Sequence, residues 1–379
     1  MAHYRKTKSG KWEVEVSLGL NPANGKRKYK SKRFKRKKDA KDWAAKQEIN
    51  KNMGIIIDAG DYTVEKYLNE WIDDHKSNIS PTTYDGYNMI IKKHLNLILG
   101  KIKLNNLKPI HIKNYFKSKR KSGRADGKKG GLSQKTLLQH YRVLSKALKE
   151  AVKMELLKRN PAQAVSSPKP KKKIIQAMNE KEINKLLKTA KNENEWTYNF
   201  IYLAVKTGMR RGELLGLRWK DINFKEKRLN IKNTLVTTKN GTIFKEPKTN
   251  ASIRPIEISD DVISVLKSIQ KNQNKRKIYL GTNYCKEYNL VFCKDNGEKY
   301  YPDTPTRRFK RIAKKVNLGQ YHLHTLRHTH ATLLLKAGVH PKIVQERLGH
   351  SSITQTLDTY SHVIPSMQRE AIEKLKGVI

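Results

Sequence analysis

The excess of positive charge is the feature that most limits how this chain can fold. Lysine and arginine number 81 against 34 aspartates and glutamates, which gives a formal charge of +47. Charge of one sign opposes a compact state unless a polyanion neutralises it, and solubility requires only a small part of this excess. The composition therefore predicts folded domains with basic surfaces that bind nucleic acid, with an affinity that falls steeply as salt rises.

The sequence shows no sign of a membrane, secreted or metal-binding protein. No apolar run approaches the ~18 residues of a membrane-spanning helix, and the stretch MAHYRKTKSGKWEV lacks the apolar core of a signal peptide. The cysteines Cys285 and Cys293 form no CxxC pair, so neither a zinc site nor a disulfide framework is indicated. We expect a cytoplasmic protein without membrane contact, metal or cofactor.

Residues 1–58 have the pattern of a small sheet followed by a helix. Apolar and polar residues alternate from Trp12 to Leu18, the period of a half-buried strand, and Ser-Gly and Asn-Gly turn signals stand on either side. KRKYKSKRF is a further strand, and from Lys38 to about Asn50 the pattern becomes helical. We expect a three-stranded sheet backed by one helix.

Residues 62–165 predict an all-helical domain. Between residues 64 and 72, apolar residues recur at i, i+3, i+4, i+7 and i+8. Ser80 is suited to cap a helix that begins at Pro81, Pro109 can open a third helix, and Ser133 can cap a fourth. The following stretch, SSPKPKKKIIQ, is typical of a linker.

Residues 174–379 mix helices with short strands, which predicts an α+β domain. Asn179 and Glu182 have capping-box spacing at a helix start. KRLNIKNTLV, TIFKEPK and SIRPIEI have strand character, with Asn240-Gly241 as a hairpin turn. Helices are expected around TPTRRFKRIAKK, TLRHTHATLLLKA, PKIVQERL and SSITQTLDTY. The expected fold class is multidomain and mainly α, with an α+β third domain.

The stretch TGMRRGELLGLRWKDI brings an arginine to a helix start. Gly208 can end one helix and Arg210 can begin the next turn. A guanidinium there offers a planar fork suited to two phosphate oxygens.

A second motif, HLHTLRHTHATLLLKAG, places His324, Arg327 and His328 at i, i+3 and i+4, on one helical face. The buried stripe of this helix is expected at Leu326, Leu333, Leu334 and Ala337. A metal site is the rival interpretation of so many histidines. However, no glutamate stands between them as in H-E-x-x-H, and a fixed arginine cation opposes a metal ion.

The third motif, LGHSSITQTLDTYSHV, contains His350 and Tyr360. Ile353, Leu357 and Tyr360 fall at i, i+4 and i+7, so Tyr360 could simply extend an apolar face. A phenol with a pKa of about 10 is a poor nucleophile unless nearby groups stabilise its charge. The surroundings of Tyr360 therefore decide its role.

The order of the motifs resembles that of the tyrosine recombinases, above all integrases of phages and conjugative transposons. The motifs are TGMRRGEL, then HTLRH, then LGH, and then a tyrosine ten residues after the histidine of LGH. The resemblance covers essentially the whole chain. It implies an arm-type DNA-binding domain at 1–58, a SAM-like core-binding domain at 62–165 and a catalytic domain at 174–379.

The resemblance implies a catalytic set of Arg210, His324, Arg327, His350 and the nucleophile Tyr360. The lysine of the family lies in a β-hairpin between the first arginine and the histidine motif. EPKTNASIRPIEI matches this place, so Lys248 is the expected residue, with Lys239 and Lys245 as alternatives. Glu213 and Asp221 match positions that support the site.

The implied chemistry is a transesterification. Tyr360 would attack a DNA phosphodiester and form a 3′-phosphotyrosine, while the arginines and His350 stabilise the phosphoryl oxygens. His324 would accept the phenol proton and the lysine would protonate the leaving 5′-oxygen. Four such exchanges on a homotetramer would recombine two duplexes.

The implied partners are double-stranded DNA with core-type and arm-type sites and an excision or directionality factor, on the bacterial nucleoid. The C-terminal stretch SMQREAIEKLKGVI could dock in cis or on a neighbouring subunit. Two other functions fit part of the pattern: a type IB topoisomerase-like enzyme, and a DNA-binding regulator without catalysis. The target sequence, the spacer length and the host element stay open, because base and phosphate contacts cannot be separated here.

Overall fold

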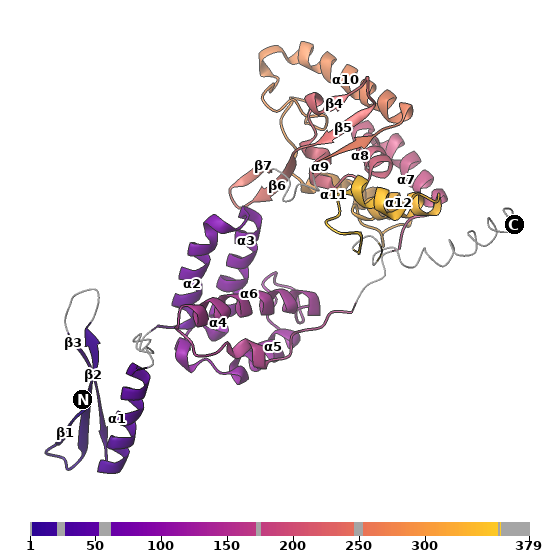
Figure 1. Ribbon diagram of the computed structural model, residues 1–379. Helices are drawn as coiled ribbons and strands as arrows, with labels where there is room; N and C mark the ends of the chain where they lie inside the picture. The colour runs from indigo at the N-terminus through magenta and orange to yellow at the C-terminus, as the bar shows by residue number, and fades with distance from the viewer. Residues whose placement is uncertain are drawn as a thin grey trace. The chain divides into compact units, whose positions relative to one another are not determined.

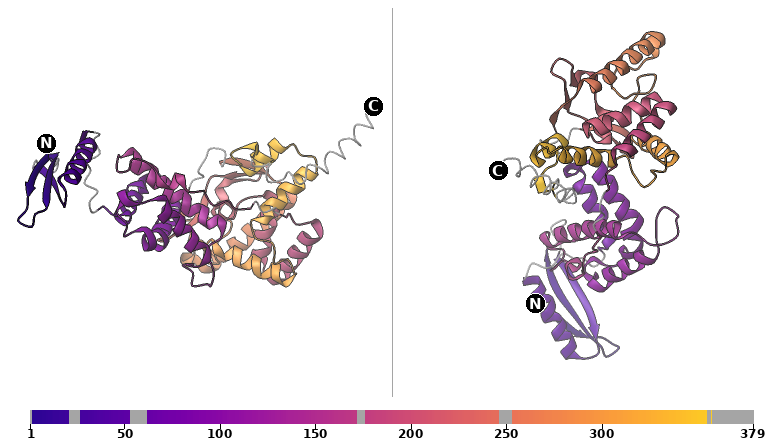
Figure 2. Two further views of the ribbon diagram at one scale, coloured as in Figure 1. Left: turned by 90° about the horizontal axis from the view of Figure 1, so that it is seen from below. Right: turned by 90° about the vertical axis from the view of Figure 1, so that its right-hand side faces the viewer.

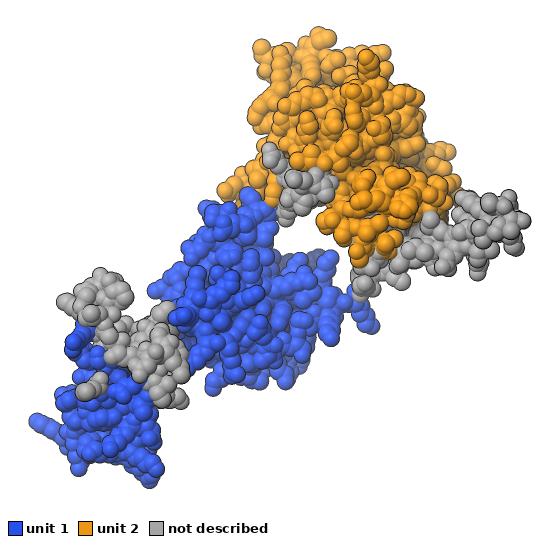
Figure 3. All heavy atoms as spheres, in the orientation of Figure 1, with its two compact units in different colours: residues 1–171 blue, residues 172–379 orange. Residues whose placement is uncertain are grey.

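The structure is a computed structural model that describes residues 2–20, 27–52, 62–171, 176–245, 253–354 and 357. The chain divides into two compact units, residues 1–171 and 172–379 (Figure 3). The boundaries expected from the sequence, 1–58, 62–165 and 174–379, remain a prediction.

The N-terminal part has the predicted three-stranded sheet and helix, and the strands pair antiparallel (Figure 1). Its elements are β1 (Ala2–Lys6), β2 (Trp12–Leu20), β3 (Arg27–Phe34) and α1 (Lys37–Asn52). The strands pair in the order β1-β2-β3. The inward residues Val14 and Val16 meet Ala40 and Ala44 of α1 in a small core, because alternate strand residues point to the same face.

The next part is all-helical. Its elements are α2 (Val64–Asp74), η1 (His75–Asn78), α3 (Pro81–Ile90), η2 (Ile91–Leu95), α4 (Asn96–Leu99), η3 (Leu104–Asn106), α5 (Pro109–Lys121), α6 (Gln134–Lys153) and η4 (Pro161–Ala164). Ser80 and Ser133 cap α3 and α6 as expected, each accepting a bond from a backbone N–H of the first turn. Pro109 is the first residue of α5. The buried face of α2 is the predicted one: Val64, Tyr67, Leu68, Trp71 and Ile72.

The second unit combines helices with two small sheets. Its helices are α7 (Glu180–Glu193), α8 (Glu195–Thr207), α9 (Arg211–Gly216), η5 (Trp219–Asp221), α10 (Asp260–Leu280), η7 (Gly281–Asn283), α11 (Asp303–Lys315), α12 (Thr325–Lys336) and α13 (Pro341–Leu348). Its strands are β4 (Ile222–Asn223), β5 (Arg228–Ile231), β6 (Thr234–Thr238), β7 (Gly241–Lys245) and β8 (Arg254–Glu257). β4, β5 and β8 form one antiparallel sheet, and β6 and β7 form a separate hairpin.

Helix α8 is central to the second unit, where it contacts α7, α10, α11 and α12 (Figures 1 and 2). Phe200, Ile201 and Leu203 on this helix are fully buried.

The stretch KRLNIKNTLV, expected to be a strand, forms two strands, β5 and β6, which belong to different sheets. The predicted fold class, mainly α with an α+β second unit, is confirmed.

Within the described part of the chain, no helix combines the length and apolar character that crossing a membrane requires.

Candidate active site

The end of α8 sets the position of the first arginine. The helix stops at Gly208, which adopts the left-handed conformation with φ 65° and ψ 12°. A Cβ at Gly208 would lie 2.6 Å from Cδ2 of His330 and 2.8 Å from Cδ2 of Leu348, so both backbone and space require glycine. Arg210 follows as the N-cap of α9.

Arg210 and Arg327 converge on the end of α13. Arg210 donates from Nη1 to the carbonyl oxygen of Leu348 at 3.5 Å and from Nη2 to that of Gly349 at 3.1 Å. Arg327 donates from Nη2 to the same Leu348 oxygen at 2.6 Å and from Nη1 to the Gly208 oxygen at 2.8 Å. Arg327 is only 2 % exposed, whereas the side chain of Arg210 is 36 % exposed. Two permanent cations therefore lie together, one of them open to solvent.

His350 lies beside these cations. It follows the left-handed Gly349, and its backbone N–H donates to the Gln345 carbonyl at 3.1 Å. Burial, and then Arg327 and Arg210, lower the pKa of His350 to about 3. The imidazole is therefore neutral at pH 7 and can donate a hydrogen bond through one N–H.

His324 is the N-cap residue of α12, and its ring stands edge-on to that of His328 with 4.8 Å between the centroids. The residue as a whole is exposed. Even so, partial burial of the ring and then Arg327 lower the pKa of His324. The ring is therefore unprotonated at neutral pH, the state that accepts a proton.

The structure thus brings together Arg210, His324, Arg327 and His350. Lys248 and Tyr360 lie outside the described residues. The alternative lysines belong to the β6–β7 hairpin: Lys245 ends β7 opposite Thr234, and Lys239 lies at the turn.

Glu213 is buried and binds Arg210. Its Oε1 accepts from Arg210 Nη1 at 2.8 Å, and its Oε2 accepts from the Arg210 backbone N–H at 2.9 Å. Burial works to raise the pKa of Glu213, but Arg254 and then Arg210 bring it below its ordinary value. Asp221, the other expected supporting residue, is also buried, at the end of η5.

Arg254 is the residue of this site that sequence reasoning missed. It lies on β8 and donates to both carboxylate oxygens of Glu213, at 3.3 and 3.0 Å. A signal was present, because Arg254 alternates with Ile256 on the buried side of the strand. An arginine in phase with inward residues indicates a buried ion pair.

The described residues contain no group of three or more His, Cys, Asp or Glu side chains that could hold a metal ion.

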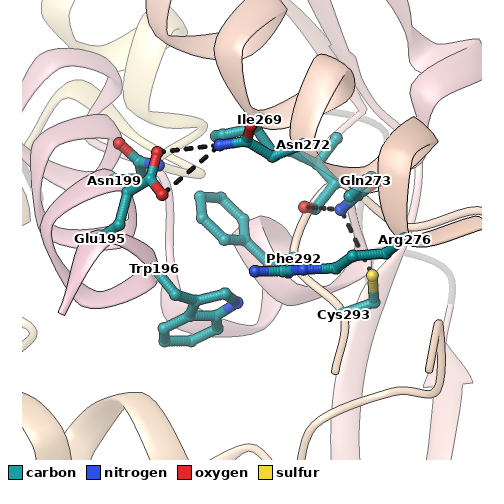
Figure 4. A pocket seen from close by; sticks show the side chains of 10 residues that line it. Glu195, Trp196, Asn199, Ile269, Asn272, Gln273, Arg276, Phe292 and Cys293 are labelled. Atoms are coloured by element: carbon teal, nitrogen blue, oxygen red, sulfur yellow. Dashed lines mark hydrogen bonds between the residues drawn. The ribbon is translucent and has the colours of Figure 1, made fainter. Parts of the chain in front are cut away.

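A separate small cavity of about 40 Å³ lies between α8 and α10, bordered by Glu195, Asn272 and Cys293 (Figure 4). Asn272 donates to the Glu195 carboxylate, and Gln273 donates to Sγ of Cys293. Glu195 begins α8, so the cavity lies at the opposite end of that helix from Gly208.

Comparison with known families agrees with this geometry. Residues 176–367 match the phage integrase family, residues 63–119 match the phage integrase N-terminal SAM-like domain, and residues 3–51 match an arm DNA-binding domain. The chain belongs to the phage integrase family. It is therefore a site-specific DNA recombinase, an enzyme that breaks and rejoins DNA strands, as the motifs predict.

Two relatives in this family match over nearly the full length, and a solved structure matches over most of this chain. A XerC-like tyrosine recombinase of Caldanaerobacter subterraneus subsp. tengcongensis is 30 % identical, over 98 % of this chain and 97 % of its own. The ICEBs1 integrase of Bacillus subtilis is 25 % identical over 99 % of both chains. The Tn1549 transposon integrase, solved with transposon right end DNA, is 25 % identical, with a TM-score of 0.69 over 83 % of this chain and 99 % of the other.

Proposed function

We propose that this integrase cuts DNA by attack of Tyr360 on a backbone phosphodiester. Arg210 and Arg327 bind the phosphoryl oxygens, and His350 donates a further hydrogen bond. His324 accepts the phenol proton, and Lys248 protonates the departing 5′-oxygen. The covalent intermediate is a 3′-phosphotyrosine. It conserves the energy of the broken phosphodiester bond until a 5′-hydroxyl of another strand reverses the step.

The convergence of the two guanidinium groups carries this proposal. The Nη1 group of Arg210 donates to Glu213 and Leu348, and one Nη2 proton is donated to Gly349. The Nε–H and the other Nη2 proton have no partner among the described residues. Prearranged donors of this kind stabilise the extra negative charge of a five-coordinate phosphorus. Each typically contributes about 10²–10³ in rate.

Exposure along the third motif also favours a reacting Tyr360. Ile353 and Leu357 would share a helical face with Tyr360, and they are 37 % and 38 % exposed. Ile353 and Leu357 are therefore not buried in the core, as they would be if this helical face were an apolar stripe. Neighbouring cations would favour the phenolate, since opposite charges shift a pKa toward the ionised form.

The proposal extends to partners. The Tn1549 integrase was solved on transposon DNA, and a lambda integrase with the same fold (20 % identity, TM-score 0.56) forms a tetramer on a Holliday junction. We infer double-stranded DNA with core-type and arm-type sites, a homotetramer on DNA, a directionality factor and a place on the bacterial nucleoid. Exchange between two labelled duplexes would distinguish recombination from topoisomerase-like religation.

The direct test offers a nicked suicide duplex to the protein. The wild-type chain should form a covalent adduct that maps to Tyr360, and Tyr360→Phe should abolish it while DNA binding is retained, because only the hydroxyl is lost. Tyr301→Phe, at a tyrosine that is 60 % exposed, is the matched control and should keep the adduct. An adduct on another tyrosine, or full adduct formation by Tyr360→Phe, would overturn Tyr360 as the nucleophile. A wild-type chain that binds DNA but forms no adduct would favour a non-catalytic regulator.

A further inference from the structure

Arg254 is a buried arginine. Burying a guanidinium group costs free energy unless its N–H groups donate hydrogen bonds. The side chain of Arg254 is 5 % exposed. Nη1 and Nη2 donate to Oε1 and Oε2 of Glu213 at 3.3 and 3.0 Å, and Nε donates to the carbonyl oxygen of Arg347 at 2.7 Å. Removing one partner of such a pair leaves an uncompensated buried charge.

The Glu213 contact leads directly to Arg210. The same two carboxylate oxygens accept from Arg210, through Nη1 at 2.8 Å and the backbone N–H at 2.9 Å. Glu213 is therefore an anion between two guanidinium groups. Arg254 fixes this carboxylate from β8, whereas Arg210 binds it from the start of α9.

The Arg347 contact leads to both arginines. The two residues after Arg347 are Leu348 and Gly349, whose carbonyl oxygens accept from Arg210 and Arg327. Arg347 is itself held by bonds to Nε2 of His330 at 3.0 Å and to the Glu257 carbonyl at 3.0 Å. Arg254 thus fixes the backbone from which the orienting carbonyls project.

We infer that Arg254 is a positioning residue for strand cleavage, which holds the Glu213 carboxylate and the end of α13 so that Arg210 and Arg327 keep one arrangement. It does not touch the reacting phosphate. The inference rests on the proposed function and adds a role to β8.

A purely structural role and a positioning role differ in their pH dependence. Without Arg254, Glu213 stays buried, which favours the neutral acid. It also loses the cation that lowers its pKa most, since Arg254 has a larger effect than Arg210. Arg210 then remains bonded to Glu213, and His324 still interacts with it electrostatically. As pH falls, the Glu213 carboxyl of the variant protonates before that of the wild type and releases Arg210.

The test measures single-turnover cleavage of the suicide duplex by the full chain between pH 6 and 8. Arg254→Gln should cleave about 10²-fold more slowly at pH 7, the scale of a 1 Å misplacement, and the ratio to wild type should widen as pH falls. Using the ratio cancels titration common to both proteins, such as that of His324. Arg211→Gln is the control, since Arg211 neighbours Arg210 but pairs with Asp303 and Thr306, and its ratio should not change with pH.

A double-mutant cycle gives a second readout. If Arg254 acts through Glu213, adding Arg254→Gln to Glu213→Gln should cost little more than Glu213→Gln alone. Additive losses, or a variant-to-wild-type ratio independent of pH, would overturn the inference. If Arg254→Gln does not fold, Arg254→Lys decides, since it keeps the charge but loses the fork: slower cleavage at an unchanged melting temperature supports positioning, and wild-type cleavage refutes it. A wild-type chain that forms no adduct would refute the proposed function instead.

Discussion

At the scale of single residues, the site depends on backbone carbonyls as much as on side chains. Arg327 is 2 % exposed and is bonded to the carbonyl oxygens of Gly208 and Leu348. Charge-assisted bonds of this kind are stronger than neutral ones. The two left-handed glycines, Gly208 and Gly349, turn the chain so that these carbonyls face the arginines.

We predict that Gly208→Ala destabilises the second unit by about 2–5 kcal/mol. About 1–2 kcal/mol comes from the left-handed backbone, and overpacking of the Cβ against His330 and Leu348 adds about 1–3 kcal/mol. Gly338→Ala is the matched control, because Gly338 has φ +78° with nothing within 4 Å. It should lose only the backbone contribution. Urea unfolding of both variants measures the difference, and equal losses would show that the space around Gly208 does not matter.

At the scale of elements, a buried polar cluster ties three helices of the first unit together. Tyr115 of α5 and His140 of α6 share a hydrogen bond of 2.7 Å between Oη and Nδ1. The ring of His94, on η2, lies 4.6 Å from that of His140, centroid to centroid. Lys119 of α5 is also buried and donates to the Gly123 carbonyl at 3.3 Å.

This cluster should make the helical part acid-sensitive. Burial, and then His94 and Lys119, lower the pKa of His140 from 6.5 to about 4. His140 is harder to protonate in the folded state than in the unfolded state, so the folded state loses stability as pH falls from 6.5 toward 4. The difference between the two pKa values corresponds to about 3 kcal/mol of unfolding free energy. We expect the urea midpoint of wild type to fall across this window, and that of His140→Gln to fall less. Parallel pH slopes for the two proteins would contradict the prediction.

At the scale of the whole molecule, the charge of +47 is carried by units that each have a separate apolar core. Burial of apolar side chains inside the units, rather than charge pairing, therefore has to stabilise the fold. The basic surface remains available for a polyanion.

The affinity of the full chain for duplex DNA should fall linearly on a plot of log K against log salt. The slope is about −0.9 for each phosphate neutralised, so ten such contacts would give about −9. Competition or fluorescence titrations between 50 and 300 mM salt measure it. A slope near zero would show that the charge excess does not serve DNA binding.

Local features were predictable because their causes are local. The Ser80 and Ser133 caps, the Asn179–Glu182 capping box and the hairpin turn before Gly241 each depend on a few adjacent residues. The motif order and the resemblance indicated Arg210, His324, Arg327 and His350, and the structure brings these together. Their catalytic roles remain part of the proposal.

Predictions that depended on the surroundings of an element succeeded less well. The buried stripe expected on α12 is correct at Leu326 but wrong at Ala337, which is exposed. Ala331 and Leu335 are buried instead, together with the polar Thr329 and His330. The helix packs against α8 and α13 at once, so its apolar residues do not mark a single face.

The sequence by itself determined the local elements, the charge that requires a polyanion, and the residue types of the reaction. Only the tertiary structure decided that Arg254, 41 residues after Glu213, supports the same carboxylate as Arg210. It also decided that carbonyls at the end of α13 orient both arginines. The reason is physical: such contacts join segments far apart in the chain, and their geometry exists only after the intervening helices and strands have packed.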